Sequence, residues 1–402
     1  MAAPTTTATD SAAAQAMKTL TAQWYNAVTA GCGLDPQTFQ LAQGFMQLGT
    51  TSQALWQTFD ALPPVSLTHF WNPTQYSSFA ATYGGVINNL IPQDSGQFQK
   101  TMGDYYPQWV EYLHSTPPPV IPNPGGILEL FHQWEQLNMP PGQGQAAYTE
   151  YQQVSQGVVP VAVQMWLNAG GGASGIKAYS NTIEDLNYQL SNTPLSKQVT
   201  MDSATQSSDV NHSWASGEVG GAVDFFLGHS AGDWDKLTTT IAQAGVEIQA
   251  KFNHFATFVT GPLAQPSTNP LLSKYQPWYD SEAISLAYQN NNYYVWNQNA
   301  PTWQGTFGPT GNLQYVTTAL VVVSGVTVSI ESAATFDSSQ QESIKASAEV
   351  GFFPFFEAES SGGWQHNITF NDEGQLNVAS TVPDGVEVVL GVMVTPSSAQ
   401  FG

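Results

Sequence analysis

The sequence predicts an α+β protein, with a mainly α-helical domain over residues 1–192 and a β-rich domain with a few short helices over residues 193–402. Apolar residues recur at helical steps of three and four in the first half, whereas they alternate with polar residues in the second half. A chain of 402 residues is also longer than one ordinary core supports, so two domains are expected. The change of period places their boundary near Asn192. No internal repeat is predicted.

Helices are expected throughout the first half. Met17, Leu20, Trp24 and Val28 form one apolar stripe at helical spacing. Asp35-Pro36 offers an N-cap acceptor followed by a proline suited to the first turn, which predicts a helix that begins there. Other helices are expected over residues 98–113, 127–137, 146–168 and 175–190.

Strands are expected in the second half. Residues 246–253 and 326–331 alternate between apolar and polar side chains, which is typical of half-buried strands. Residues 386–394 are almost continuously apolar, which indicates a central strand. One short helix is expected over residues 338–349.

Composition limits the partners. The net charge is −22, only 9% of residues are charged, and the eight basic residues are all lysines. A chain with so few cations cannot neutralise many phosphates, so nucleic acid is not an expected partner, and anionic lipid would also be repelled. Few basic groups leave little repulsion when the carboxylates are protonated, which favours an extracellular or cell-surface location. We recognise no signal peptide and no transmembrane helix, and the single cysteine, Cys32, excludes an intrachain disulfide.

One motif suggests hydrolysis. Residues 228–232, Gly-His-Ser-Ala-Gly, match the G-x-S-x-G turn that exposes a nucleophilic serine, and the motif resembles that of lipases and esterases of the α/β-hydrolase family. The resemblance implies Ser230 as the nucleophile and His366 as the base, with Asp280 or Asp337 as the acid of the triad. The surrounding order of elements, helices before the motif and strands after it, differs from that family, so hydrolysis is an alternative and not the main prediction.

Two Glu-x-x-His pairs suggest a metal. Glu111 with His114 and Glu129 with His132 resemble the ligand pairs of ferritin-like di-iron bundles. Their helical phase directs them away from the neighbouring apolar stripes, whereas bundle ligands point inward. A solvated helix face is the favoured interpretation, and neither a metal nor another cofactor is predicted.

Aromatic residues provide the main functional prediction. Tyr293, Tyr294, Trp296 and Trp303 lie in a polar-aromatic segment, and exposed rings bind sugars, membrane interfaces or proteins. We therefore expect a non-enzymatic protein that acts by self-assembly, as a homo-oligomer or filament, or by binding a glycan or a neutral membrane surface. The alternatives are a membrane-active, toxin-like protein, an expectation drawn from the helical-plus-β arrangement of several secreted toxins, and a serine hydrolase.

Overall fold

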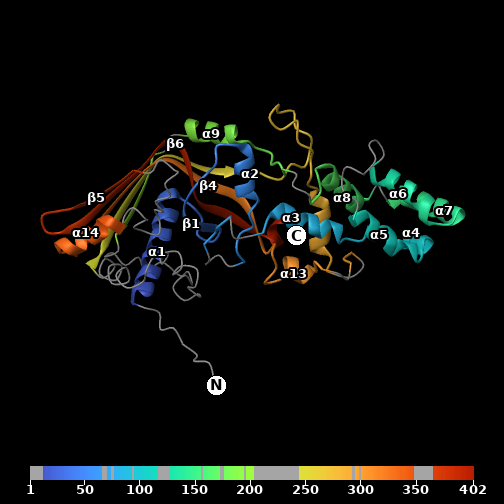
Figure 1. Ribbon diagram of the computed structural model, residues 1–402, viewed down its shortest axis with the longest axis horizontal. Helices are drawn as coiled ribbons and strands as arrows, with labels where there is room; N and C mark the ends of the chain where they lie inside the picture. Colours follow the sequence, from blue (N-terminus) through green and yellow to red (C-terminus); the bar gives the residue numbers. More distant parts are fainter. Residues whose placement is uncertain are drawn as a thin grey trace, which may run out of the picture.

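The computed structural model has the predicted α+β class, with helices mainly before residue 193 and an antiparallel sheet in the C-terminal half (Figure 1). The structure describes residues 12–65, 70–73, 77–92, 95–115, 126–154, 157–172, 176–193, 196–202, 244–291, 295–297, 300–347 and 365–402. The molecule is elongated in Figure 1, with β5 at one end and α7 at the other. The chain end marked C lies near the middle, beside α3.

The helices are short apart from the first. Several begin at side-chain caps, such as Thr182, which forms a reciprocal capping box with Asp185 at the start of α9. Their bounds are α1 Ala12–Cys32, α2 Ser52–Asp60, α3 Phe79–Asn88, α4 Ser95–Met102, α5 Tyr105–Ser115, α6 Gly126–Asn138, α7 Pro141–Val154, α8 Val158–Asn168, α9 Ile183–Asn192, α12 Ser281–Gln289, α13 Trp303–Phe307, α14 Ser338–Ser347 and α15 Ser397–Gln400.

The six-stranded sheet is antiparallel throughout and has the order β1-β6-β4-β3-β2, with β5 also paired to β6. Its long central strands carry most of the pairing, for example Val328 opposite Ala250 on one side and Ser380 on the other. The strand bounds are β1 Phe39–Gln47, β2 Lys197–Asp202, β3 Val246–Val259, β4 Tyr315–Thr335, β5 Gln365–Phe370 and β6 Gln375–Pro396.

The central strands are buried on both faces, which explains their nearly continuous apolar sequences. In β4, Leu320 and Val322 pack into a core shared with α2, α3, α8, α9 and α12, whereas Val321 and Val323 pack into a second core on the opposite face. The second core receives the apolar stripe of α1, including Trp24 and Val28. β6 has the same alternation, so the prediction of a central strand over residues 386–394 is confirmed.

Four expected helices differ from the structure, among them the one expected over residues 175–190, where residues 176–182 are not helical and α9 begins only at Ile183. The segment after Asp35-Pro36 forms β1, because Phe39 and Leu41 face the α1 core while Gln40 and Ala42 point the other way, which is the period of a strand. The segment 98–113 is divided into α4 and α5 at Gly103, whose φ of 55° interrupts the helix. The segment 146–168 is divided between α7 and α8. The first core contains residues from both sides of position 192, and the predicted domain boundary stays a prediction.

Two joins between antiparallel strands have partly similar sequences, a similarity that hydrophobic periodicity does not detect. Residues 203–245 connect β2 to β3, and residues 336–374 connect β4 to β6. In each case a glycine with a positive φ directly precedes the second strand: Gly245, with a φ of 98°, precedes β3, and Gly374, with a φ of 77°, precedes β6. The sequences of both joins match at spaced positions. The matches are Ala204/Ala334, Thr205/Thr335, Ser216/Ser347, Glu218/Glu349, Val219/Val350, Gly220/Gly351, Phe225/Phe355, Phe226/Phe356, Ser230/Ser360, Gly232/Gly362 and Trp234/Trp364.

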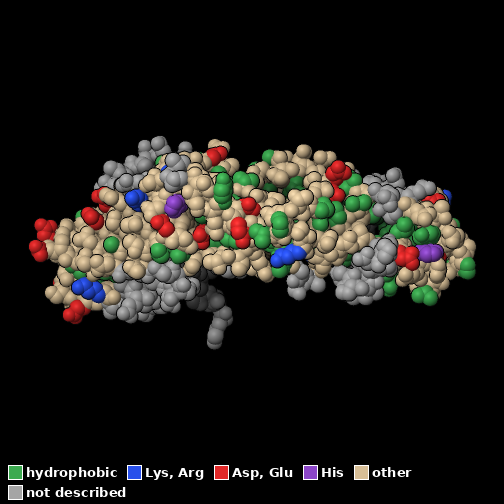
Figure 2. Space-filling view, turned by 90° about the horizontal axis from the view of Figure 1, so that it is seen from above, with side chains coloured by type: hydrophobic (Ala, Val, Ile, Leu, Met, Phe, Trp, Pro, Cys, Tyr) green, Lys and Arg blue, Asp and Glu red, His purple; other side chains and the backbone are tan. Residues whose placement is uncertain are grey.

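The small share of charged residues in the sequence leaves much of the surface uncharged. Figure 2 shows acidic side chains scattered over the face it displays, with lysines placed singly between large uncharged areas. Among the described helices, none combines the length and apolar character that crossing a bilayer requires.

Candidate ligand-binding cavity

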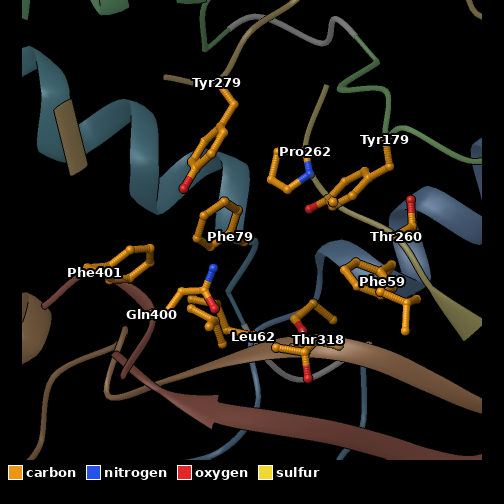
Figure 3. Close-up of a pocket in the computed structure, with 15 residues that line it drawn as sticks. Phe59, Leu62, Phe79, Tyr179, Thr260, Pro262, Tyr279, Thr318, Gln400 and Phe401 are labelled. Atoms are coloured by element: carbon orange, nitrogen blue, oxygen red, sulfur yellow. Dashed lines mark hydrogen bonds between the residues drawn. The ribbon is translucent and has the colours of Figure 1, made fainter. Parts of the chain in front are cut away.

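The candidate site is a half-open cavity of about 260 Å³ at the end of the sheet where β3 ends and β4 begins (Figure 3). The sheet forms one wall, and the ends of α2 and α3 with the segments before α9 and α12 form the others. Its lining residues are Phe59, Ala61, Leu62, Phe79, Tyr179, Val259, Thr260, Gly261, Pro262, Tyr279, Val316, Thr317, Thr318, Gln400 and Phe401.

Backbone pairing outside the sheet builds the upper wall. After β3 ends, the chain pairs with residues 178–180: Ser180 N–H donates to the Gly261 carbonyl at 2.8 Å, and Leu263 N–H donates to the Ala178 carbonyl at 3.1 Å. Trp278 N–H donates in turn to the Leu263 carbonyl at 2.9 Å. Three distant segments are thereby held together, so Tyr179 and Tyr279 are placed on one side of the cavity.

Aromatic rings pack against one another in this wall. The Tyr279 ring lies 5.1 Å from that of Tyr83 and 5.9 Å from that of Phe79, measured between centroids, and Tyr179 packs edge-on against Phe59 at 5.1 Å. Tilted and edge-to-face pairs at these distances add attraction to their apolar burial. Packed aromatic rings therefore form much of this wall of the cavity.

Two polar groups facing the cavity have no hydrogen-bond partner among the described residues, the Tyr279 hydroxyl and the Gln400 amide. Tyr279 as a whole is only 9% exposed, but its hydroxyl is not among the buried side-chain atoms without a partner in the described part of the chain, so this hydroxyl is within reach of water in the cavity. Burial, followed by the charge of Asp280, raises the pKa of Tyr279, so the phenol remains a neutral donor. The threonine hydrogens are already used, as when Thr317 Oγ1 donates to the Ala61 carbonyl at 3.2 Å.

A carboxylate holds the Tyr179 side chain from outside the cavity. The Tyr179 hydroxyl donates to Asp60 Oδ1 at 2.7 Å, Ala80 N–H donates to the same oxygen at 2.9 Å, and the Ser78 hydroxyl donates to Oδ2. Burial raises the pKa of Asp60, against the opposing effects of these hydrogen bonds and of Lys177. Asp60 is not among the residues that line the cavity, and its hydrogen bond positions the lining residue Tyr179.

The C-terminal end of the chain closes the lower wall. Phe401 is 3% exposed, and Gln289 Nε2 donates to its carbonyl oxygen at 3.4 Å. Its ring lies 6.0 Å from that of Phe307, which in turn lies 6.1 Å from Trp296 and 6.0 Å from Trp303. Two residues of the predicted aromatic site thus form a layer directly behind the cavity wall.

The predicted aromatic residues are placed differently from one another. Trp296 is 4% exposed and its indole N–H donates to the carbonyls of Ala287 and Asn290, at 3.0 and 2.7 Å. Trp303 is half-buried. Tyr293 and Tyr294 lie outside the described residues. A direct binding role for these four residues stays a prediction, and the structure gives the two tryptophans a supporting position.

The predicted hydrolase residues cannot be compared in space. Ser230 lies outside the described residues, and of His366 only the backbone is described, within β5 and opposite Ser380. Ser230 nevertheless belongs to one of the two similar joins, where its counterpart Ser360 is preceded by Ala358-Glu359 and not by Gly-His. The similarity of the joins therefore offers a second origin for the G-x-S-x-G pattern.

Of the residues considered as metal ligands, Glu111 and His114 lie in α5, and Glu129 and His132 lie in α6. His132 stacks on Tyr148 at 4.2 Å between ring centroids, and its Nδ1 lies 3.0 Å from Glu135 Oε1. Glu129 Oε1 accepts from Gln133 Nε2 at 3.0 Å, Glu111 is exposed, and the His114 side chain is outside the described set. No group of three metal-binding side chains occurs among the residues that the structure describes.

Sequence reasoning missed the cavity because its lining comes from seven separate stretches of chain. The available local signals were Thr260-Gly261-Pro262, which ends a long strand, and Tyr279-Asp280, which starts a capped helix. No family model matches the chain, and neither the curated proteins nor the solved structures include a significant match.

Proposed function

We propose that this protein acts by binding a small ligand in the cavity between β3, β4 and the aromatic wall. The observation that carries the proposal is a cavity into which the hydroxyl of the largely buried Tyr279 and the amide of Gln400 both point, without a hydrogen bond to other described residues. Concave, mostly apolar sites with a few placed polar groups are where proteins bind small molecules. None of the described lining residues is a carboxylate, histidine, cysteine or lysine, which supports binding and not acid–base or nucleophilic catalysis.

A substitution at Gly261 tests the proposal. An added Cβ there would meet no atom within 4 Å, and the backbone φ is outside the strained region, so Gly261→Phe should fold and occupy cavity space. Gly142→Phe is the matched control, because Gly142 is exposed in α7 and also has open space at Cβ.

The assay is ligand-observed NMR with a library of small neutral fragments. Binding by the unsubstituted protein and by Gly142→Phe, but not by Gly261→Phe, is the expected result. Fragments that bind all three proteins equally, or none of them, would reject the cavity as the functional site.

Membrane activity is a second candidate, favoured by the similarity of the two joins. The pairs Val246–Ser332 and Thr335–Gln375 place the ends of both joins at the same end of the sheet. The similar sequences 216–234 and 347–364 share a Phe-Phe pair, a tryptophan and carboxylates, and neither contains a lysine. Protonation would leave these sequences uncharged apart from histidine, which supports contact with a neutral bilayer in acid.

Dye release from phosphatidylcholine vesicles at pH 4 and pH 7 tests this candidate. Release at pH 4 that is lost when Phe226→Ser and Phe356→Ser are combined would support it. Absence of release at both pH values, or release that the double substitution leaves unchanged, would reject it. Light scattering on the same samples tests the predicted self-assembly, which a monomer at both pH values would reject.

A further inference from the structure

We infer that the ligand of the cavity is one neutral sugar ring, presented as the end of a glycan or glycoside. The inference rests on the proposed binding function and specifies its ligand. Three features of the site lead to it: the charge of the lining, the arrangement of ring faces and polar groups, and the opening.

The lining excludes ionic ligands on energetic grounds. Its fifteen described residues include no Asp, Glu, Lys or His, and two carboxylates adjacent to lining residues already accept hydrogen bonds: Asp60 from three donors, and Asp280 from the Glu282 and Ala283 N–H groups. A charged ligand would lose hydration without gaining an opposite charge, which is strongly unfavourable in a partly closed site. A phosphate, carboxylate or ammonium ligand is therefore disfavoured, and a neutral ligand is favoured.

The wall has both surfaces that a sugar ring needs. A pyranose presents C–H groups on its faces and hydroxyls around its edge. Aromatic rings from Phe79, Tyr279 and Phe401 surround the cavity for contact with the faces. The Tyr279 hydroxyl can donate and accept, and the Gln400 amide can do both as well, which matches the dual character of sugar hydroxyls. A purely apolar ligand would displace water from the Tyr279 hydroxyl without replacing its hydrogen bonds, an unfavourable outcome.

The opening accounts for the size and attachment of the ligand. A cavity of about 260 Å³ is at the small end of ligand pockets, which suits one ring and not a chain of rings. Val259, which is 65% exposed, and Gln400, which is exposed, stand at the solvent side. Further sugar units can extend from the bound ring past these residues into solvent.

The experiment uses the full chain and neutral methyl glycosides of glucose, galactose, mannose and N-acetylglucosamine, observed by saturation-transfer NMR. Glucuronic acid is the anionic control, and phenol is the control for an apolar ring with one hydroxyl. At least one glycoside should bind the unsubstituted protein and Gly142→Phe but not Gly261→Phe. Tyr279→Phe, which removes only the hydroxyl, should weaken glycoside binding about five-fold and leave phenol binding within two-fold.

The outcomes separate the inference from the function on which it rests. Phenol binding that Gly261→Phe abolishes, without binding of any glycoside, would overturn the sugar inference and leave the cavity as a ligand site. Equal binding of glucuronic acid and the neutral glycosides would also overturn it, because the argument from an uncharged lining would then be wrong. Lack of binding by every probe would reject both.

Discussion

Asp60 offers the sharpest test of how the cavity wall is held. We consider two substitutions, Asp60→Ala and Asp60→Asn. Alanine removes the acceptor for the Tyr179 hydroxyl, the Ala80 amide and the Ser78 hydroxyl, whereas asparagine keeps one carbonyl oxygen with nearly the same shape. Comparison of the two separates the loss of hydrogen bonds from the loss of charge.

The structure sets the size of the effect. Tyr179 is 1% exposed, so its hydroxyl cannot turn to water when the carboxylate is removed, and the Ala80 amide loses its partner too. An unsatisfied buried donor costs about 1–3 kcal/mol, so two of them predict a destabilisation of about 2–6 kcal/mol for Asp60→Ala. Asp60→Asn should cost less at neutral pH, because it retains an acceptor and carries no charge that burial disfavours.

The raised pKa of Asp60 also predicts how the stability of the protein changes with pH. Burial raises the pKa of Asp60 above its unfolded value of 3.8, so the folded protein binds the proton more tightly than the unfolded chain does. The stability contributed by the protonated group is complete below pH 3.8 and is lost as the pH rises through the raised folded pKa. The melting temperature of Asp60→Asn relative to the unsubstituted protein should therefore increase from pH 4 to pH 7.

Thermal unfolding followed by intrinsic fluorescence measures this difference, with the exposed Asp372→Asn as the control for a general change in charge. A relative melting temperature for Asp60→Asn that falls over the same interval would refute the reasoning. It would mean that the three hydrogen bonds favour the ionised carboxylate more strongly than burial disfavours it.

Three further predictions concern stability. Gly84→Ala should destabilise the protein by about 1–3 kcal/mol, because its Cβ would lie 2.3 Å from the Trp166 ring. The control, Gly85→Ala, should be neutral or stabilising by up to about 1 kcal/mol, because its Cβ would make only an ordinary contact. Urea unfolding measures both free energies. Lys177, whose pKa burial lowers to about 8, should make stability rise from pH 8 toward pH 10.5, and Lys177→Met should flatten that rise in melting temperature. Gly374→Ala should lower the melting temperature more than Gly385→Ala, because both glycines have a positive φ, 77° and 84°, but only the Cβ at position 374 would clash, 2.7 Å from the Phe336 carbonyl oxygen; equal effects would contradict this.

Sequence patterns predict the α+β class and most strands because the central sheet is buried on both faces over long stretches. Residues 386–394 are apolar at both alternating positions, and a segment of that composition must have a core on each side. The same reasoning fails after Asp35, where good helix-start residues precede a strand. Local capping preference is worth about 1 kcal/mol there, whereas Phe39 and Leu41 are 0% and 3% exposed against α1 and the sheet, and their burial outweighs it.

The cavity could not be predicted from the sequence, because neither its aromatic wall nor its polar groups form a local pattern. Tyr179, Tyr279 and Gln400 are brought together by pairing between residues 178–180 and 261–263 and by docking of the C-terminal end. The predicted aromatic segment was close to the site without forming it, since Trp296 and Trp303 support Phe401 through Phe307. Composition indicated that rings are important, and only the long-range contacts show which rings face a ligand.

The similarity between the two joins is visible in the sequence itself, at the paired identities between residues 204–234 and 334–364. Hydrophobic periodicity compares each residue with neighbours a few positions away, so it does not detect identities spread over two distant joins. The sheet makes the comparison obvious, because two antiparallel pairs each enter their second strand through a glycine of positive φ. That similarity also bears on Ser230: the second join keeps Ser360 and Gly362 but has Ala358 where the G-x-S-x-G pattern has its first glycine. What the joins share, Ser-x-Gly-x-Trp after a Phe-Phe pair, is the pattern whose role should be tested first, in both joins together.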